Sequence, residues 1–228
     1  MVTLDQLRRD VLTACRIVDG KRLVEGYGHV SVRIPGTPRV LITPRVALGL
    51  IRSAAELVVV DLEGKKIQGK GVAPLEIFMH TEVYRRRPDV HAICRTHSPM
   101  ALALSVLGQT VKPLNGFGSF LGEVSVFPKP YLITTRELGQ EVAGTLGSAG
   151  GLLLRGNGTL LVGATLAEAT IRAVFLEEAA AVHLRARSVG EPVIFSAEEI
   201  ARRTDVGYDH YGRAWDYYAK VYGKGTRR

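Results

Sequence analysis

Two side chains that could bind a small anion stand two residues apart in the stretch Val90–Leu107. The stretch opens with residues typical of a strand and continues as an apolar run, with Ser98 and Pro99 at the junction as expected for the start of a helix. Side chains alternate along a strand, so Arg95 and His97 are expected on one face, beside the positive end of that helix. This arrangement suits an anionic ligand, and the planar guanidinium of Arg95 suits a carboxylate.

The elements that must position these two residues are a series of helices and short strands. Helices are expected over Leu4–Val18, from Pro74 to Pro88, from Thr134 to Gly147 and from Thr165 to about Ala186. Short strands are expected between residues 28 and 68 and on both sides of Gly156–Gly158. The region 109–133, rich in glycine, proline and phenylalanine, is expected to be an ordered loop. Helices on both sides of a mixed sheet predict an α/β fold.

Composition and charge narrow the classes of function. The chain has 228 residues, of which 46% are hydrophobic, so one domain is expected. It has neither an apolar run long enough to span a membrane nor an apolar leader, so we expect a cytoplasmic protein without a membrane partner. The formal charge of +8 comes from scattered residues and a basic tail, Lys224–Arg228, so nucleic-acid binding is not expected. Because neither a dinucleotide fingerprint nor a phosphate loop is present, no nucleotide or organic cofactor is expected.

Four motifs, in order and spacing, resemble those of the class II aldolase/adducin family. They are Gly28-His29-Val30-Ser31-Val32-Arg33, Glu76 with His80 one turn later, Arg95-Thr96-His97-Ser98-Pro99 and Leu152-Leu153-Leu154-Arg155-Gly156-Asn157-Gly158. The resemblance runs from Leu4 to about Ala186. It implies a three-layer α/β/α sandwich around a mostly antiparallel sheet, and a homotetramer with active sites at subunit interfaces. We therefore interpret residues 1–228 as a single domain of this family, with residues 187–228 as a C-terminal helical and aromatic tail.

The resemblance fails at the metal site. The three metal-binding histidines of the family align with Arg95, His97 and Asn157, so two of them are replaced. Arginine has no lone pair to give and asparagine offers only a weak carbonyl oxygen, so a tight zinc site is not expected. His97 is left as the histidine ligand, with Glu76 open as a second ligand. A divalent ion (Mn, Zn or Mg) whose coordination is completed by substrate or water stays open as a cofactor.

The remaining site residues follow from the same resemblance. Glu76 matches the acid/base carboxylate and is expected to be catalytic together with His97, whereas Arg95 either binds substrate or only neutralises Glu76. The other expected substrate contacts are Asn157, His29 and Ser31. Two roles are open for the tail residues Tyr208, His210 and Tyr211. They either cover the active site of a neighbouring subunit or pack against their own domain, and packing is favoured.

The substrate is expected to be a small carboxylate without a phosphate group. Sugar-phosphate members have an asparagine and a pair of serines where this chain has His29 and Pro74-Leu75. The leading hypothesis is a carbon–carbon lyase, and specifically a decarboxylase of a hydroxylated aromatic or oxo acid. The alternatives are a divalent-metal-dependent aldolase or epimerase and, from another class, a non-catalytic binding module like the adducin head.

Overall fold

A computed structural model of the chain describes residues 3–223, and the predicted basic tail Lys224–Arg228 lies outside them. The strands are β1 His29–Arg33, β2 Arg39–Ile42, β3 Val58–Asp61, β4 Lys66–Gln68, β5 Ala92–Thr96, β6 Val124–Phe127, β7 Gly151–Leu154 and β8 Gly158–Gly163. In the described part they form an eight-stranded sheet in the order β4-β3-β2-β1-β5-β8-β7-β6. Its neighbouring strands run antiparallel except β6 and β7, which are parallel. The mostly antiparallel sheet agrees with the prediction.

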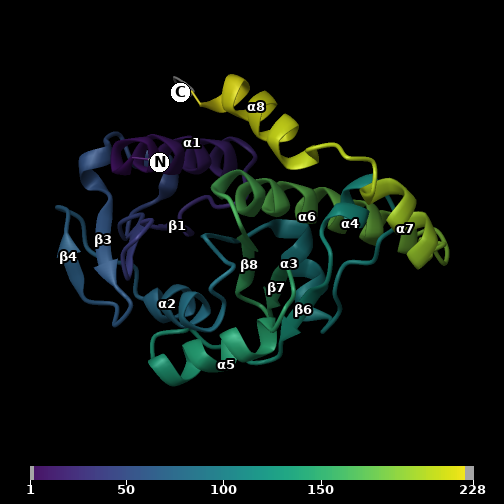
Figure 1. Cartoon of the computed structure of the whole chain (residues 1–228). Helices are drawn as coiled ribbons and strands as arrows, with labels where there is room; N and C mark the ends of the chain where they lie inside the picture. The colour runs from purple at the N-terminus through teal and green to yellow at the C-terminus, as the bar shows by residue number, and fades with distance from the viewer. Residues whose placement is uncertain (1–2, 224–228) are drawn as a thin grey trace.

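Helices cover both faces of this sheet (Figure 1). They are α1 Leu4–Gly20, α2 Ile77–Arg86, α3 Pro99–Val106, α4 Gly116–Phe120, α5 Arg136–Leu146, α6 Leu166–Arg187, α7 Ala197–Thr204 and α8 His210–Tyr222, with 3-10 turns at Leu48–Leu50 and Ala54–Glu56. In Figure 1, α1, α6 and α8 lie above the sheet, and α2 and α5 lie below it. The α/β/α layering predicted from the sequence is confirmed.

The two faces have separate hydrophobic cores because strand side chains alternate between them. Val30 and Cys94 point into the core shared with α1 and α6. Ile93, the residue next to Cys94, points into the core shared with α2 and α5. The same alternation sends Ser31 and Arg95 toward α2, so the polar residues of β1 and β5 meet the helix that follows Glu76.

The structure corrects two of the predicted elements. The helix expected from Pro74 begins at Ile77, and Glu76 is its N-cap residue with its carboxylate turned toward β5. The region expected to be a loop, 109–133, contains α4 and the edge strand β6. The long helix expected after Thr165 is confirmed, and the Thr165 hydroxyl accepts a hydrogen bond from the Glu168 backbone N–H.

The aromatic tail packs against the layer formed by α1 and α6. The Tyr211 hydroxyl donates to the Phe120 carbonyl oxygen and accepts from Arg172 Nε at 3.2 Å. The His210 ring stacks on Phe120 with 3.9 Å between the ring centroids, whereas Tyr208 is 48% exposed. For Tyr211 and His210, these contacts favour a packing role over a role in covering a neighbouring subunit's active site. Within residues 3–223, no helix combines the length and the apolar character needed to cross a membrane.

Candidate active site

Arg95 is the centre of a cluster that unites four of the predicted site residues. Its side chain lies on β5 and is 1% exposed. Nη2 donates to Glu76 Oε2 at 3.1 Å and to the Asn157 backbone oxygen and Oδ1 at 2.7 and 3.0 Å. Nη1 lies 2.7 and 2.6 Å from the two ring nitrogens of His97. The guanidinium therefore binds the carboxylate, the amide and the imidazole at once.

Strand pairing brings these residues together from distant parts of the sequence. In the β5–β8 ladder Arg95 lies opposite Leu160, and the turn before β8 carries Asn157. Gly158 follows Asn157 with φ of +103°, and a Cβ there would lie 2.2 Å from the Thr96 carbonyl oxygen. Only glycine fits so close an approach with this backbone conformation, and the approach places Asn157 against the guanidinium.

Both oxygens of the Glu76 carboxylate accept hydrogen bonds. Oε2 pairs with Arg95, and Oε1 accepts from the Ile133 backbone N–H at 3.1 Å and from Asn157 Nδ2 at 3.2 Å. Burial lowers the pKa of Arg95, and the adjacent Glu76 opposes that shift. Because the two charges neutralise each other away from water, removing either one leaves a buried charge without a partner.

His97 lies at the boundary between this buried pair and solvent. Its backbone N–H donates to the Leu23 carbonyl oxygen at 2.7 Å, and its ring is only partly buried. Burial and the positive charge of Arg95 lower the pKa of His97 to about 4, so the imidazole is neutral at pH 7. Nδ1 lies 3.3 Å from the Tyr27 carbonyl oxygen, which can only accept, so a hydrogen bond between them requires the single ring proton on Nδ1. In that tautomer Nε2 accepts from Arg95.

His29 and Ser31 form a second polar group next to this cluster. In the β1–β5 ladder His29 lies opposite Arg95, and the residue is partly exposed. Ser31 is completely buried, and its hydroxyl bonds His80 Nδ1 at 2.7 Å and the Tyr84 hydroxyl at 2.8 Å. Ser31 therefore lies behind the exposed surface of the site and not on it, which corrects the expectation of a direct substrate contact.

The sequence reasoning missed the role of α2 in this second group. The sequence gives neither His80 nor Tyr84 a place among the expected site residues, yet His80 Nε2 lies 3.4 Å from His29 Nδ1. The signal that was available is their spacing, because residues four apart on a helix share a face. One polar face of α2 therefore supports β1.

The residues present do not fit a divalent metal at the family's position. Glu76, His97 and Asn157 all direct their polar atoms at the guanidinium of Arg95, a permanent cation with no lone pair. Nowhere in residues 3–223 do three or more His, Cys, Asp or Glu side chains stand close enough to hold a metal ion. A divalent ion is therefore not assigned to this cluster.

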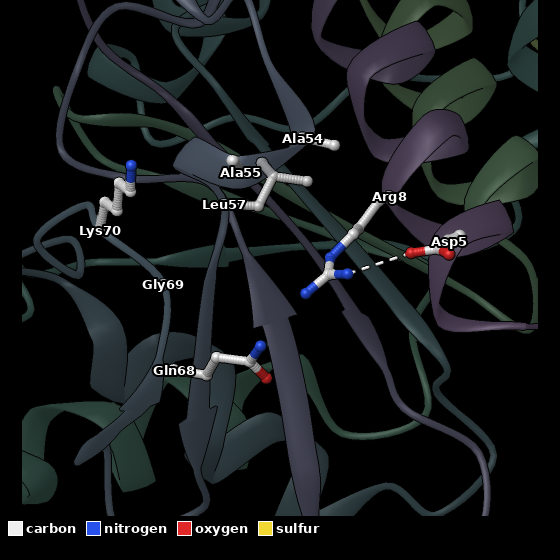
Figure 2. Close-up of a pocket in the computed structure, with 8 residues that line it drawn as sticks. All are labelled: Asp5, Arg8, Ala54, Ala55, Leu57, Gln68, Gly69 and Lys70. Atoms are coloured by element: carbon white, nitrogen blue, oxygen red, sulfur yellow. Dashed lines mark hydrogen bonds and ion pairs between the residues drawn. The ribbon is translucent and has the colours of Figure 1, made fainter.

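A separate pocket of about 520 Å³ lies between the start of α1 and the β3–β4 edge of the sheet. Figure 2 shows Arg8 and Asp5 of α1 on one side, joined by an ion pair of 3.0 Å, and Gln68, Gly69 and Lys70 on the other. None of the predicted site residues is among the described residues that line it. The pocket is therefore distinct from the Arg95 cluster.

The fold and the four motifs define the family of the protein. The model of the class II aldolase and adducin N-terminal domain matches residues 9–184. The chain therefore belongs to the class II aldolase/adducin family, as its motifs predicted.

Individual relatives give a finer comparison. A 3,4-dihydroxyphthalate decarboxylase from Arthrobacter keyseri is 31% identical over 198 residues, which cover 80% of this chain and 79% of the relative. A protein of the same name from Terrabacter sp. (strain DBF63) is 31% identical over 225 residues, covering 91% of this chain and 93% of the relative. The solved L-fuculose 1-phosphate aldolase from Glaciozyma antarctica PI12 superposes with a TM-score of 0.84 at 23% identity, covering 100% of this chain and 96% of that one, and so supports the fold.

Proposed function

We propose that the protein is a carbon–carbon lyase that decarboxylates a hydroxylated aromatic or oxo acid without a phosphate group. The observation that carries this proposal is the buried Arg95–Glu76 pair, joined at 3.1 Å and flanked by the partly exposed His97 and Asn157. The names of the relatives, decarboxylases of a dihydroxylated aromatic acid, confirm the predicted class of activity.

Loss of carbon dioxide needs a cation to hold the carboxylate, donors for the oxygen on which negative charge develops, and a proton for the carbon. In the proposed reaction Arg95 holds the carboxylate through N–H groups that Glu76 and Asn157 occupy in the free protein. The Nδ1–H of His97 gives up its hydrogen bond to the Tyr27 carbonyl oxygen and donates to a substrate oxygen instead. Asn157 Nδ2 donates to the same substrate oxygen. The site then binds a carboxylate together with a neighbouring hydroxyl or oxo group.

The proton comes from Glu76 in this scheme. When a substrate carboxylate takes over Arg95, Glu76 is left in a buried environment without a counter-charge, and a carboxylate in that position takes up a proton from solvent. Glu76 then transfers this proton to the carbon that carries the carboxylate. The bond to the carboxylate breaks, its electron pair returns to the ring or enolate, and carbon dioxide leaves. Glu76 is ionised again and returns to Arg95, so charge and protons balance over one cycle.

The proposal is tested by carbon dioxide release from a panel of hydroxylated aromatic and oxo acids, with 3,4-dihydroxyphthalate included because it is the substrate in the names of the relatives. Glu76→Gln is expected to lower turnover by about 10²- to 10⁴-fold, the usual contribution of a general acid. Glu82→Gln is the matched control, because Glu82 is a buried, arginine-paired carboxylate on α2 away from the cluster. Full activity of Glu76→Gln, or no turnover of any acid in the panel by folded protein, would overturn the proposal.

The two alternatives make different predictions. A metal-dependent aldolase or epimerase requires about one equivalent of metal per chain and loses activity with a chelator. Elemental mass spectrometry on protein purified without added metal or chelator measures the first quantity directly. A non-catalytic module predicts that Glu76→Gln and His97→Ala leave the cellular role intact. The homotetramer remains a proposal from the family resemblance, and light scattering of the purified protein measures its mass.

A further inference from the structure

We infer that His29 is a further catalytic residue, which donates its Nε2–H to the substrate oxygen next to the departing carboxylate, and that Tyr84, Ser31 and His80 hold it in this tautomer. The inference rests on the proposed function. It adds a fixed neutral donor to a site whose other polar groups surround Arg95.

The four side chains form one continuous row of hydrogen-bonding atoms. The Tyr84 hydroxyl lies 2.8 Å from Ser31 Oγ, Ser31 Oγ lies 2.7 Å from His80 Nδ1, and His80 Nε2 lies 3.4 Å from His29 Nδ1. Tyr84, Ser31 and His80 are at most 1% exposed, whereas His29 is partly exposed. The row therefore runs from the protein interior to the surface of the site.

Proton counting gives the row a single direction. If His80 donated from Nδ1 to Ser31, either Ser31 would donate to Tyr84 or Tyr84 would donate to Ser31. The Tyr84 proton in the first case, or the Ser31 proton in the second, would then be buried without an acceptor among the described residues. In the opposite direction Tyr84 donates to Ser31, Ser31 donates to His80 Nδ1, and His80 donates from Nε2 to His29 Nδ1. Every buried donor then has an acceptor, and the one proton of the His29 ring must be on Nε2.

This direction of donation requires both histidines to be neutral, and their surroundings keep them neutral. Burial, together with the charge of Arg95, lowers the pKa of His80 to about 3. Burial and then His80, Arg95 and His97 lower the pKa of His29 well below its usual value. Each imidazole therefore has one ring proton at pH 7, and its position is set by hydrogen bonding.

The free nitrogen of His29 is placed to meet a substrate held by Arg95. The β1–β5 register sets His29 opposite Arg95, and Nε2 is the ring nitrogen that is not used toward His80. Within residues 3–223, His29 Nε2 has no hydrogen-bond partner of its own. A neutral N–H dipole there stabilises a developing phenolate or enolate without adding a charge that would compete for the carboxylate. The substrate class is thus an acid with an oxygen on the carbon next to the one that loses its carboxylate.

The tautomer can be measured without any substrate. In protein labelled with ¹⁵N-histidine, long-range ¹H–¹⁵N correlation spectra distinguish Nδ1–H from Nε2–H rings, and the His29→Gln variant assigns the His29 signals. We expect the Nε2–H form for both His29 and His80, and a mixture of forms in Tyr84→Phe. Thr170→Val, which removes a buried hydroxyl from α6, is the matched control and should leave both tautomers unchanged. An Nδ1–H ring at His29 in the wild type, or no response to Tyr84→Phe, overturns the inference.

Kinetics with 3,4-dihydroxyphthalate then test the catalytic role, because its carboxylate at C2 is adjacent to the hydroxyl at C3. Tyr84→Phe is expected to lower kcat by about five- to tenfold with little change in KM, which is the scale of one hydrogen bond. The His29→Gln variant retains an N–H near the Nε2 position that does not depend on a tautomer, so adding Tyr84→Phe should cost nothing further. If Tyr84→Phe lowered kcat equally in the wild type and in His29→Gln, the role of Tyr84 would be only structural. Correct tautomers without turnover of any acid in the panel would instead count against the proposed function alone.

Discussion

At the scale of single residues, the Arg95–Glu76 pair couples stability to the proposed chemistry. Replacing Arg95 by Met leaves the Glu76 carboxylate buried without a counter-charge, so we expect a loss of about 3–5 kcal/mol in the free energy of unfolding. The double variant Arg95→Met/Glu76→Gln should regain about half of that loss or more, because the unpaired charge is gone. Urea unfolding of the three proteins measures both values, and a double variant no more stable than Arg95→Met would contradict the account.

A second prediction at this scale concerns the metal. The family resemblance implies that Arg95 and Asn157 stand where histidines bind metal, beside His97. The double variant Arg95→His/Asn157→His is therefore expected to bind about one zinc per chain, since three imidazoles satisfy the ligand requirement. Asn157→His alone is the control, because the guanidinium stays in place and should keep zinc out. Elemental mass spectrometry decides the matter, and equal zinc in the wild type would refute the interpretation.

Several of these residues were predictable from the sequence, and others were not. Strand alternation placed Arg95 beside His97, and the family resemblance added Glu76 and Asn157. The bond between Ser31 and Tyr84 joins residues 53 positions apart on different elements. No local pattern encodes such a contact, because it depends on how α2 packs across β1.

At the scale of elements, the turn between β7 and β8 controls the shape of the site. Gly158→Ala would set a Cβ 2.2 Å from the Thr96 carbonyl oxygen and 3.1 Å from Arg95 Nη1. We expect the free energy of unfolding to fall by about 1–2 kcal/mol from the strain of a positive φ and by about 1–3 kcal/mol more from overpacking. Carbon dioxide release should fall as well. The matched control is Gly156→Ala, where φ is +69° and a Cβ has open space within the described structure. Gly156→Ala should lose only the stability that the positive φ costs. Equal losses of stability in the two variants would show that the close approach of Gly158 to Thr96 is unimportant.

The elements themselves were predicted best where their ends are marked locally. Thr165 caps α6 as expected, because a side-chain oxygen bonded to a backbone N–H is encoded within one turn. The start of α2 was predicted too early because Glu76 turns toward Arg95, a partner on β5 that helix patterns cannot reveal. The edge strand β6 was missed because it pairs in parallel with β7, which lies later in the sequence.

At the scale of the whole molecule, stability should decrease in mild acid. His80 has a pKa of about 3 in the folded protein against 6.5 for an unperturbed histidine, so the unfolded chain binds a proton that the folded chain does not. From His80 alone, the free energy of unfolding therefore falls by about 1.4 kcal/mol per pH unit as the pH drops from the unfolded pKa toward the folded one. The lowered pKa values of His29 and His97 add to the slope.

Urea unfolding at about pH 6.5 and about pH 5 measures this slope above the range in which carboxylates dominate. His80→Gln should lower the slope by about 1.4 kcal/mol per pH unit, the contribution of one histidine, whereas replacement of the exposed His91 by Gln should leave it unchanged. A slope of the same size in His80→Gln and the wild type would show that other groups cause the acid sensitivity.

The order of strands in the sheet also has a consequence for how the chain folds. β5 has β1 on one side and β8 on the other, so the pairs His29–Arg95 and Arg95–Leu160 join segments that are far apart along the sequence. Such contacts form late and slowly, because a long stretch of chain must be ordered before they can close. We therefore expect the site to be assembled by pairings that close late in folding. During refolding, catalytic activity should return only with the final cooperative phase, after the local helices have formed.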